Sequence, residues 1–480
     1  MIKILFINAV NPASEIENRY QPLGLMYLAA SLQEAFPANT FRIKLVNRDI
    51  EKELDSFRPD VAGITAVSQN FNYAARYADY CHDRGIPVMV GGVHISVLPE
   101  CLTPRMEVGC IGEGEATIVE LMKVFIGSGK RFPPKELEKI PGLVFRSGGE
   151  LVRTPVSPGG PGPAQPPHPC RHLHGKVRHA YIFSSRGCPY RCLFCASSRY
   201  WDKPRYFPAG YVVDEIEELA EKWGARLISF YDDLFVADNR RLARIAELVV
   251  KRGLAGRVKF TCSCRANTVT PEVVSELKKM GVRSVGLGLE SGNSRVLKML
   301  KGRSASVEDN RRAVELLYSA GIRANASFII GSPDETLAEM MDTYRFIRKS
   351  RLSFVDIYLL TPFPGTPVWD LAGARGLVSA GMDWSRLNVN FEENKKNAVI
   401  MSEIFSRAEI TSSYNKFRRL RLVRNIMALP GHPMIVDLPR VAFGTFREKL
   451  SRSTGAIRQG IHHGKIPDPP GRPGDAPGTS

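Results

Sequence analysis

The chain has 480 residues, 44% hydrophobic and 24% charged, with a formal net charge of +17 at pH 7, a composition ordinary for a soluble globular protein of two to four domains. No run approaches the ~18 apolar residues that span a membrane, and the N-terminal segment is too short for a signal peptide. Nine cysteines fit a reducing compartment better than a secreted disulfide framework, so we expect a cytoplasmic protein.

Residues 1–135 alternate short apolar runs with amphipathic helical patterns, which indicates a parallel sheet wrapped by helices. Such sheets bind ligands at the loops after the carboxyl ends of their strands, where glycines let the backbone approach a large ligand. The predicted strands are Ile2–Asn8, Phe41–Val46, Val61–Ala66, Pro87–Val90 and Val108–Ile111. The loop residues that we expect to bind a ligand are Ser68, Gly91, Gly92, Gly112, Glu113 and Gly114.

Residues 136–178 are predicted to connect two domains. Gly142–Phe145 and Leu151–Arg153 surround a Ser-Gly-Gly-Glu turn and predict a hairpin. The Pro- and Gly-rich segment Pro155–Pro169 is typical of an interdomain linker or an extended strap.

A second series of strands and helices occupies residues 179–380 and predicts a partial (βα)6 barrel. Active residues should gather at the carboxyl ends of its strands, as they do in complete βα barrels. The predicted strands are His179–Ser185, Leu227–Tyr231, Lys259–Ser263, Ser284–Gly288, Asn325–Ile330 and Phe354–Leu360.

The C-terminal region, residues 381–464, is expected to be mainly helical and is strongly basic. The segment Tyr414–Arg424, with Phe417, Leu420 and Leu422, suits a basic amphipathic helix that lies on an anionic membrane surface or meets an acidic partner. A solvated basic face explains the same pattern. Nucleic acid is not expected, because no nucleic-acid-binding module accompanies the charge. Residues 465–480 are predicted to be disordered.

Three cysteines, Cys188, Cys192 and Cys195, form a C-x3-C-x2-C motif directly after the first strand of the second series. Three thiolates hold three irons of a cubane cluster and leave the fourth iron open. A structural zinc site would bring paired C-x2-C ligands, and no second pair follows here. Cys170 is an alternative fourth ligand, but it lies far upstream in a Pro-rich stretch.

This motif, with the aromatic Phe194 before its last cysteine, resembles the signature of the radical S-adenosylmethionine (SAM) enzymes. The resemblance implies a [4Fe-4S] cluster whose open iron binds SAM and cleaves it to a 5′-deoxyadenosyl radical. Strand ends of the second series resemble the SAM-binding elements of the family, although helix capping or a structural role explains each one singly. By this resemblance, the SAM-binding candidates are Phe194, Asp232, Asp233, Arg265, Glu290, Ser291 and Gly331.

The first domain resembles the Rossmann-like cobalamin-binding domain of one radical SAM subgroup, which includes methyltransferases and the anaerobic porphyrin-ring cyclase. The resemblance rests on Tyr20–Ala30, Gly91–His94 and Gly112–Glu115, and assigns the six loop candidates of this domain to cobalamin. One departure is that Asn8–Pro12 stands where many cobalamin proteins carry a cobalt-ligating histidine motif. The resemblance therefore implies cobalamin without a lower protein ligand, and His94 is not assigned to cobalt.

These resemblances predict a cobalamin-dependent enzyme that methylates an unactivated carbon of a small molecule or lipid, with flavodoxin or ferredoxin as an electron donor. No single catalytic residue is identified from the sequence. Oxidative cyclisation or rearrangement without methyl transfer is the alternative that uses the same cofactors. Two further alternatives are an RNA-modifying methylthiotransferase, for which the first domain lacks a convincing second cysteine set, and a non-catalytic corrinoid or cluster sensor.

Overall fold

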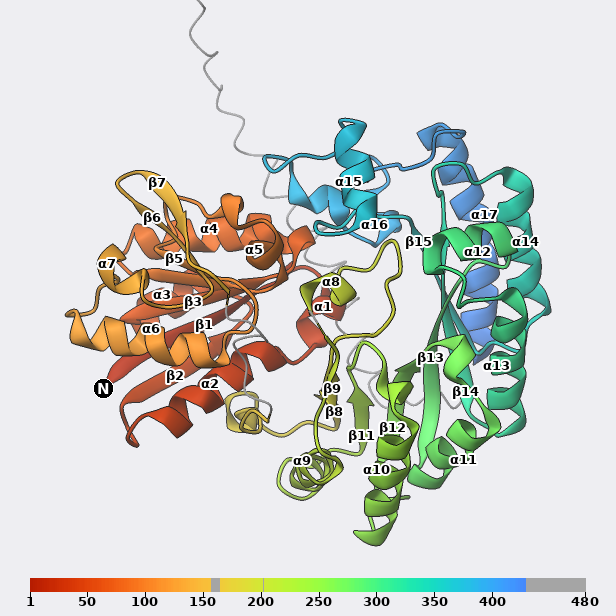
Figure 1. The fold of residues 1–480 in the computed structure, drawn as a ribbon, viewed down its shortest axis with the longest axis horizontal. Helices are drawn as coiled ribbons and strands as arrows, with labels where there is room; N and C mark the ends of the chain where they lie inside the picture. The colour runs from red at the N-terminus through yellow and green to blue at the C-terminus, as the bar shows by residue number, and fades with distance from the viewer. Residues whose placement is uncertain (157–164, 202, 429–480) are drawn as a thin grey trace, which may run out of the picture. The chain divides into compact units, whose positions relative to one another are not determined.

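The computed structural model describes residues 1–156, 165–201 and 203–428. Two large sheets form its framework: the first is built from N-terminal strands, red to yellow in Figure 1, and the second from the green strands that follow His179. Helices alternate with the parallel strands of both sheets, so the predicted α/β fold class is confirmed.

The first sheet has the strand order β2-β1-β3-β4-β5-β6-β7. Strands β1 to β5 are parallel, and the chain passes from β1 out to β2 and then back to β3 on the other side of β1. The carboxyl ends of β1 and β3 therefore flank a topological switch point, where open α/β sheets bind ligands. The strands are β1 (Ile2–Ala9), β2 (Phe41–Val46), β3 (Val61–Ala66), β4 (Val88–Gly91), β5 (Val108–Cys110), β6 (Leu143–Ser147) and β7 (Glu150–Arg153).

The predicted hairpin is β6–β7, and it joins the first sheet instead of standing between domains. β6 pairs antiparallel with β5, placing Phe145 opposite Val108. Val144 and Phe145 are both fully buried, which explains why the hairpin docks on the sheet.

Helices cover both faces of the first sheet. On one face, α2 and α6 pack apolar side chains such as Leu25 and Ile118 against Ile4 and Phe6 of β1. On the other face, α3 and α4 cover Leu5 and Ile7. This strict alternation along β1 gives the strand two buried faces. The helices of this part are α1 (Glu15–Arg19), α2 (Leu23–Ala35), α3 (Ile50–Phe57), α4 (Phe71–His82), α5 (Val93–Val97), α6 (Glu115–Gly127) and α7 (Pro134–Leu137).

The second sheet has six parallel strands in sequential order, β8-β11-β12-β13-β14-β15, so β8 and β15 are its two edges. This is the predicted partial barrel. The strands are β8 (His179–Ile182), β11 (Leu227–Phe230), β12 (Lys259–Cys264), β13 (Val282–Glu290), β14 (Arg323–Ile330) and β15 (Phe354–Leu359). The helices that cover its apolar face are α9 (Ala209–Glu221), α10 (Asn239–Lys251), α11 (Pro271–Met280), α12 (Ser294–Lys301), α13 (Val307–Ser319) and α14 (Leu337–Lys349).

The cysteine motif lies in a loop that leaves the second sheet after β8. A short antiparallel pair, β9 (Ser185–Arg186) and β10 (Arg205–Tyr206), closes the base of this loop, and α8 (Ser197–Tyr200) follows the third cysteine. The loop is therefore held at both ends at the carboxyl side of the first strand, where barrel enzymes place reactive groups.

The C-terminal part of the described chain contains α15 (Pro367–Ala374), α16 (Phe391–Asn394) and α17 (Arg407–Ala428). Helix α17 runs along the β15 edge, where the Asn425 side chain donates to the Val355 carbonyl at 3.1 Å and accepts from its N–H at 2.9 Å. A side-chain amide thus satisfies backbone groups that a further strand would otherwise pair.

This packing shows what covers the apolar side of the helix predicted at Tyr414–Arg424. Phe417 is 1% exposed in the core beside the sheet, and Leu420 is half-buried against the same core. Leu422 is exposed, together with Val423, Ile426 and Met427. The apolar face thus covers the protein's own sheet, and a different apolar group is exposed at the end of α17.

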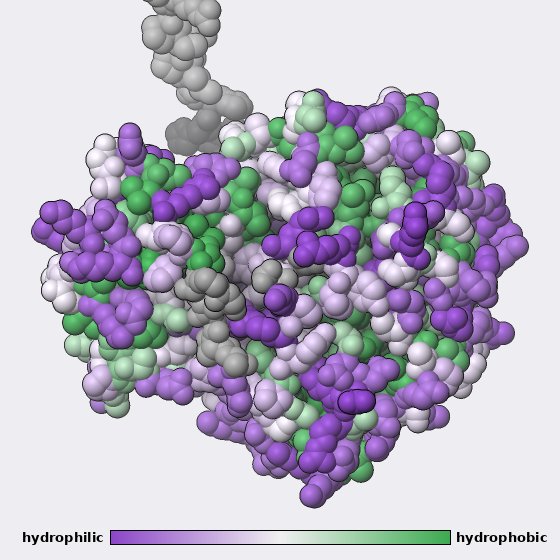
Figure 2. All heavy atoms as spheres, in the orientation of Figure 1, coloured by the Kyte–Doolittle hydropathy of each residue, from purple (hydrophilic) through white to green (hydrophobic). Residues whose placement is uncertain are grey.

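Several sequence-based predictions fall on residues 157–164 and 429–480, outside the described residues: most of the Pro-rich linker, the rest of the basic region and the disordered tail. Within the described ranges, no helix is long and apolar enough to cross a membrane. In Figure 2, hydrophilic side chains predominate on the outer side of the helices that surround the second sheet.

Candidate active site

A cavity of about 500 Å³ opens at the switch point of the first sheet. One wall comes from β1, β3, β4 and the helices α2 and α6, and the other comes from the segment around β9, the end of α8 and the end of β11. The volume is typical of a site for a small molecule or cofactor. The wall from the first sheet includes Phe6, Leu23, Gly24, Tyr27, Leu28, Thr65, Val67, Gly91, Gly92, Gly112, Glu113, Gly114 and Ile118. The facing wall consists of Phe183, Ser185, Arg186, Tyr200, Trp201, Tyr231 and Asp233.

Glycines shape the wall formed by the first sheet. Gly92 has φ +96°, and a Cβ built there would lie 2.7 Å from Thr65 Oγ1 and 2.8 Å from the Ala66 carbonyl oxygen. Gly91 faces open space instead, because the nearest atom to its built Cβ is 3.9 Å away on Cys110. Gly92 is thus required for the turn itself, whereas Gly91 leaves room for a ligand against the backbone.

Five of the six predicted cobalamin-binding residues line this cavity: Gly91, Gly92, Gly112, Glu113 and Gly114. Ser68 does not line it; this residue is buried in a short 3-10 helix, and its neighbour Val67 lies at the wall. The assignment of these residues to a cofactor stays a prediction, but the structure brings five of them to one place.

His94 follows the same glycines but faces the opposite side of the sheet. Its ring stacks on Phe71 with 3.9 Å between centroids and meets the edge of Trp384 at 4.4 Å. Its two nitrogens have no hydrogen-bond partner among the described residues, and burial lowers the pKa of His94 to about 3. The residue is therefore a neutral core histidine, in agreement with its omission from the cobalt ligands.

A buried ionic cluster connects the two walls of the cavity. Arg186, which precedes the cysteine motif by two positions, pairs with Glu113 at 3.1 Å and with Glu115. Arg205 also pairs with Glu113. Arg186 is 7% exposed and its two partners 5–6%. Since buried charges persist only when they are paired, this cluster fixes the two loops relative to each other.

The three motif cysteines are half-buried and lie in one loop, and none of them forms a disulfide. The loop is anchored where the Leu193 N–H donates to the Leu300 carbonyl at 2.8 Å. Among the described residues, no three His, Cys, Asp or Glu side chains are gathered closely enough to hold a metal ion, so the thiols are not preorganised. Their number, shared loop and solvent access still suit an iron–sulfur cluster, whose ligands are thiolates.

Arg265, another predicted SAM-binding residue, contacts this motif directly. Its Nη1 donates to Cys192 Sγ at 3.2 Å, and its Nη2 donates to the Lys301 carbonyl at 3.0 Å. Its guanidinium also lies over the Tyr190 ring, 4.0 Å from the centroid. The side chain is 5% exposed, so its positive charge acts locally on the cysteine loop.

Asp233 and Glu290 also lie near the loop. Asp233 lines the cavity and accepts a hydrogen bond from the Gly187 N–H at 3.1 Å. Glu290 lies 3.5 Å from Lys301, and burial raises the pKa of this carboxyl. Its φ of +61° is unusual for a residue with a side chain and accompanies a break in the pairing of β13 with β14. Phe194 is partly buried against an apolar core instead of lining the cavity.

Three other predicted SAM-binding residues are already used by the fold. Asp232 accepts hydrogen bonds from the Ser184 N–H, the Ser184 hydroxyl and the Ser185 hydroxyl at 2.5–2.7 Å. The Ser291 hydroxyl lies 3.0 Å from that of Thr343. The Gly331 N–H donates to Glu335 at 2.8 Å. Their role as SAM ligands stays a prediction, and their observed partners hold strand ends in place.

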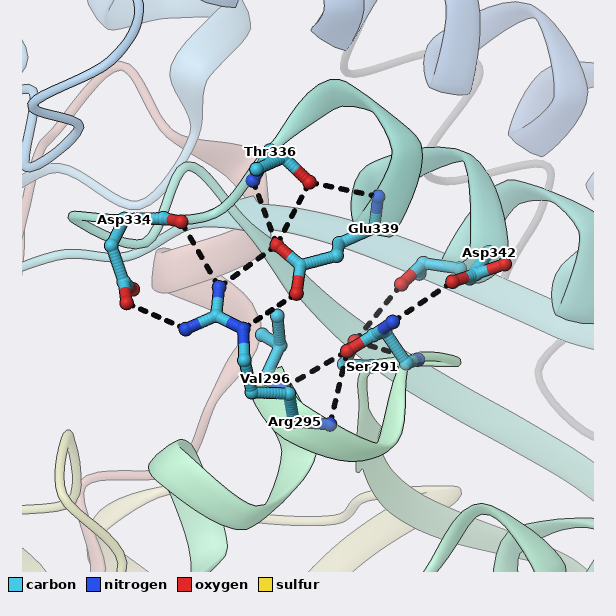
Figure 3. A network of polar contacts seen from close by, with 9 residues as sticks. Ser291, Arg295, Val296, Asp334, Thr336, Glu339 and Asp342 are labelled. Atoms are coloured by element: carbon cyan, nitrogen blue, oxygen red, sulfur yellow. Dashed lines mark hydrogen bonds and ion pairs between the residues drawn. The ribbon is translucent and has the colours of Figure 1, made fainter.

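The network around Ser291 shows how these strand-end motifs support the barrel (Figure 3). Arg295 at the start of α12 points between Glu339 and Asp334, donating to Glu339 Oε1 at 2.6 Å and to Asp334 Oδ2 at 2.5 Å. Glu339 and Thr336 form a capping box at the start of α14. The network therefore joins the beginnings of two neighbouring helices.

Most residues of the facing wall were not predicted from the sequence to belong to the site. Phe183, Tyr200, Trp201 and Tyr231 line the cavity, but isolated aromatic residues in the sequence do not indicate which surface they share. Arg186 offered a usable signal, since an arginine beside the cysteine motif is a natural partner for glutamates in a ligand loop.

Comparison with known proteins agrees with both halves of this arrangement. The B12 binding domain family matches residues 12–122, and the Radical SAM superfamily matches residues 182–347. An uncharacterized methyltransferase of Pyrococcus horikoshii is 31% identical over 76% of this chain and 81% of its own length. The anaerobic magnesium-protoporphyrin IX monomethyl ester cyclase of Cereibacter sphaeroides is 25% identical over 89% of this chain and 72% of its own length.

A solved structure shares the fold. The radical SAM methyltransferase TsrM from Kitasatospora setae, with tryptophan and a SAM analogue bound, superposes with a TM-score of 0.65 at 19% identity. The match covers 79% of this chain and 77% of that chain.

Proposed function

This chain belongs to the cobalamin-binding radical SAM enzymes, and we propose that it transfers a methyl group to an unactivated carbon of a small molecule. The observation that carries the proposal is the shared cavity, since one wall comes from the B12-binding sheet and the other from the segment that bears the cysteine motif. Two cofactors held on these walls would act on one substrate. The methyltransferase relatives support the same reaction class.

The side chains and backbone of the two walls fit both cofactors. Cys188, Cys192 and Cys195 would hold the cluster, and the glycine-lined wall with Gly91 would hold cobalamin against the backbone. When bound, the cluster and SAM supply the radical that removes a hydrogen atom from the substrate, and cobalamin supplies the methyl group. The protein contributes binding, orientation and the exclusion of water.

Charged residues of the second sheet orient SAM beside the cysteine loop. Arg265 offers a positive charge next to Cys192, and Asp233 offers a carboxylate at the cavity wall. A zwitterionic ligand needs one group of each sign. Glu290 contributes a buried carboxyl group beside Lys301 to the SAM site. Asp232, Ser291 and Gly331 support the SAM site indirectly, because their hydrogen bonds hold the strand ends in place.

Anaerobic reconstitution with cluster and cobalamin, followed by incubation with SAM carrying a deuterated methyl group, tests this function. The expected products are 5′-deoxyadenosine and a substrate that has gained a deuterated methyl group. Cys192→Ala should abolish 5′-deoxyadenosine formation, whereas Cys101→Ala, which changes a half-buried cysteine outside the motif, should leave it unchanged. A product that loses hydrogen or gains oxygen without the label would favour cyclisation, the reaction named for the Cereibacter relative.

An electron donor is the partner that this chemistry requires. We propose a small acidic redox protein such as flavodoxin or ferredoxin, supported by the net charge of +17 and by the exposed Lys416, Arg418 and Arg419 on α17. Turnover with such a donor should fall with rising salt concentration, whereas turnover with a small chemical reductant should not.

We also propose that the end of α17 makes a peripheral contact with a membrane surface. Leu422, Val423, Ile426 and Met427 are 56–78% exposed at the end of α17, next to Arg419. Such a group suits insertion into an anionic lipid surface. Cosedimentation with vesicles of phosphatidylserine and phosphatidylcholine, compared with phosphatidylcholine alone, tests the contact; equal recovery in the supernatant of both samples would contradict it.

A further inference from the structure

The second sheet carries a polar face opposite the one that its helices cover. Here this surface is called the inner face. Along every strand, residues alternate between the apolar core and this face, as Thr261, Cys262 and Ser263 illustrate. The register aligns Ser229, Thr261, Ser284 and Arg323 in one row, and Ser263, Gly286, Asn325 and Phe354 in a second. A third row consists of Gly288, Ser327 and Asp356, so Phe354 is the one apolar side chain in these three rows.

This composition does not suit a packed barrel interior. Parallel strands buried on both faces are apolar throughout, and filled barrels carry bulky branched side chains inside. On the inner face, by contrast, Ser263 and Asp356 are exposed, and Thr261, Asn325 and Ser327 are only half-buried. The space over these residues therefore remains available to a ligand.

Hydrogen bonds across the strands prearrange the polar groups of the inner face. His179 Nε2 lies 2.8 Å from the Ser229 hydroxyl, which lies 2.6 Å from that of Thr261. Asn325 Nδ2 donates to Ser284 at 2.8 Å, while Asn325 Oδ1 is buried and has no hydrogen-bond partner among the described residues. A buried amide oxygen in this state calls for a donor from a ligand or water.

The inner face meets the shared cavity through a group of tyrosines. The Tyr231 ring, which lines the cavity, is 5.6 Å from the ring of Tyr181 on β8 and 5.7 Å from that of Tyr20. A molecule bound on the inner face therefore lies beside the facing wall of the cavity, the wall that includes Tyr231. This adjacency is what a substrate of the proposed reaction requires.

We propose that the polar side chains of the inner face select a polar small molecule with hydroxyl or amine donors as the substrate, not a hydrocarbon lipid. This inference rests on the proposed function. Asp356 accepts a hydrogen bond from the substrate, supported by Ser327 in the same row and Asn325 in the row before it. An apolar ligand would remove these polar groups from water without giving them hydrogen-bond partners, which is unfavourable for each group.

Asp356 is well placed for this role. Its side chain is exposed, yet protein atoms around it raise the pKa of its carboxyl, an effect that the positive charge of Arg421 on α17 opposes. A carboxylate that is partly shielded from water forms stronger hydrogen bonds than one on an open surface. Asp356 thus distinguishes ligands with donors from ligands without them.

The test uses reconstituted holoenzyme and small-molecule extracts of the cells that make the protein, partitioned into a water-soluble and an organic-soluble fraction. Each fraction is supplied with SAM bearing a deuterated methyl group, and both 5′-deoxyadenosine and labelled products are measured. The expected result is that only the water-soluble fraction stimulates 5′-deoxyadenosine formation. Stimulation by the organic fraction alone, or by neither fraction, would overturn the polar-substrate proposal.

The two readouts separate this inference from the proposed function. Stimulation by the water-soluble fraction without labelled product would support the inner face and contradict methyl transfer. Asp356→Asn and Ser327→Ala should each raise the concentration of the active fraction needed for half-maximal stimulation, by roughly tenfold for Asp356→Asn. Asp79→Asn, which alters an exposed carboxylate on α4, is the matched control. Unchanged half-maximal concentrations in both inner-face variants would overturn the assignment.

Discussion

Arg265 donates a hydrogen bond to the thiol of Cys192 at 3.2 Å, linking the end of β12 to the centre of the cysteine motif. The same guanidinium is fixed by the Lys301 carbonyl and the Tyr190 ring, so it approaches the motif in one orientation. A buried positive charge at this point attracts a carboxylate ligand.

Replacing Arg265 should therefore impair SAM cleavage more than cluster assembly. Arg265→Lys keeps the charge but loses the fork of donors, and we expect at least a tenfold lower rate of 5′-deoxyadenosine formation at unchanged iron content. Iron analysis and chromatography of the products measure both quantities. Arg283→Lys, an exposed position on β13, is the control; equal rates for the two variants would remove Arg265 from the SAM site.

The ionic cluster of Arg186 with Glu113 and Glu115 predicts a large loss of stability on truncation. Arg186→Met leaves two buried carboxylates with less compensation, and breaking a buried pair costs about 3–5 kcal/mol. Urea unfolding followed by circular dichroism gives the free energy. The exposed pair Arg311–Glu308 provides the comparison, because Arg311→Met should change stability by less than about 1 kcal/mol. Similar losses in both variants would show that the cluster does not hold the two loops together.

Gly92 tests the shape of the B12-binding wall. An alanine there combines φ +96° with contacts of 2.7 and 2.8 Å, so Gly92→Ala should displace the loop and prevent retention of cobalamin during gel filtration. Gly210→Ala in α9 meets no atom within 4 Å and should leave retention unchanged. Full cobalamin retention by Gly92→Ala would mean that this turn does not shape the site.

His94 gives the fold a defined pH dependence. Its pKa is about 3 in the folded protein against an ordinary value of 6.5 for histidine, so the unfolded chain binds the proton more readily below pH 6.5. Stability should therefore fall as the pH drops from 6.5 towards 3, by about 1.4 kcal/mol per unit at most, with no such contribution above pH 6.5. Urea unfolding of wild type and His94→Leu should diverge progressively below pH 6.5. Parallel pH profiles would contradict the burial of a neutral imidazole, and His172→Asn, at an exposed position, should follow wild type.

Features that depend on local sequence were predictable. The cysteine motif needs only neighbouring residues, and Gly91, Gly92 and Glu113 follow strand ends whose position apolar periodicity reveals. Features that depend on partners far away in the sequence were not predictable. Asp232 turns towards Ser184 and Ser185, 48 and 47 positions away, and Arg186 reaches Glu115 across 71 positions.

Phe417 illustrates the same limit at the level of a helix. The amphipathic pattern of the helix around Phe417 indicates that one side of the helix is covered, but it does not indicate which surface covers it. In the structure, that side packs along the edge strand β15. The alternation along β12 and β14 was present in the sequence as well. Its meaning as an open polar face became clear only from the register of the six strands.

The proposed reaction requires a cluster and a corrinoid bound to the same chain, and the absorption spectrum of anaerobically reconstituted protein tests this most directly. We predict that iron–sulfur absorption and a corrinoid band both remain with the protein after gel filtration. A spectrum with the cluster but no corrinoid band would contradict methyl transfer through the shared cavity.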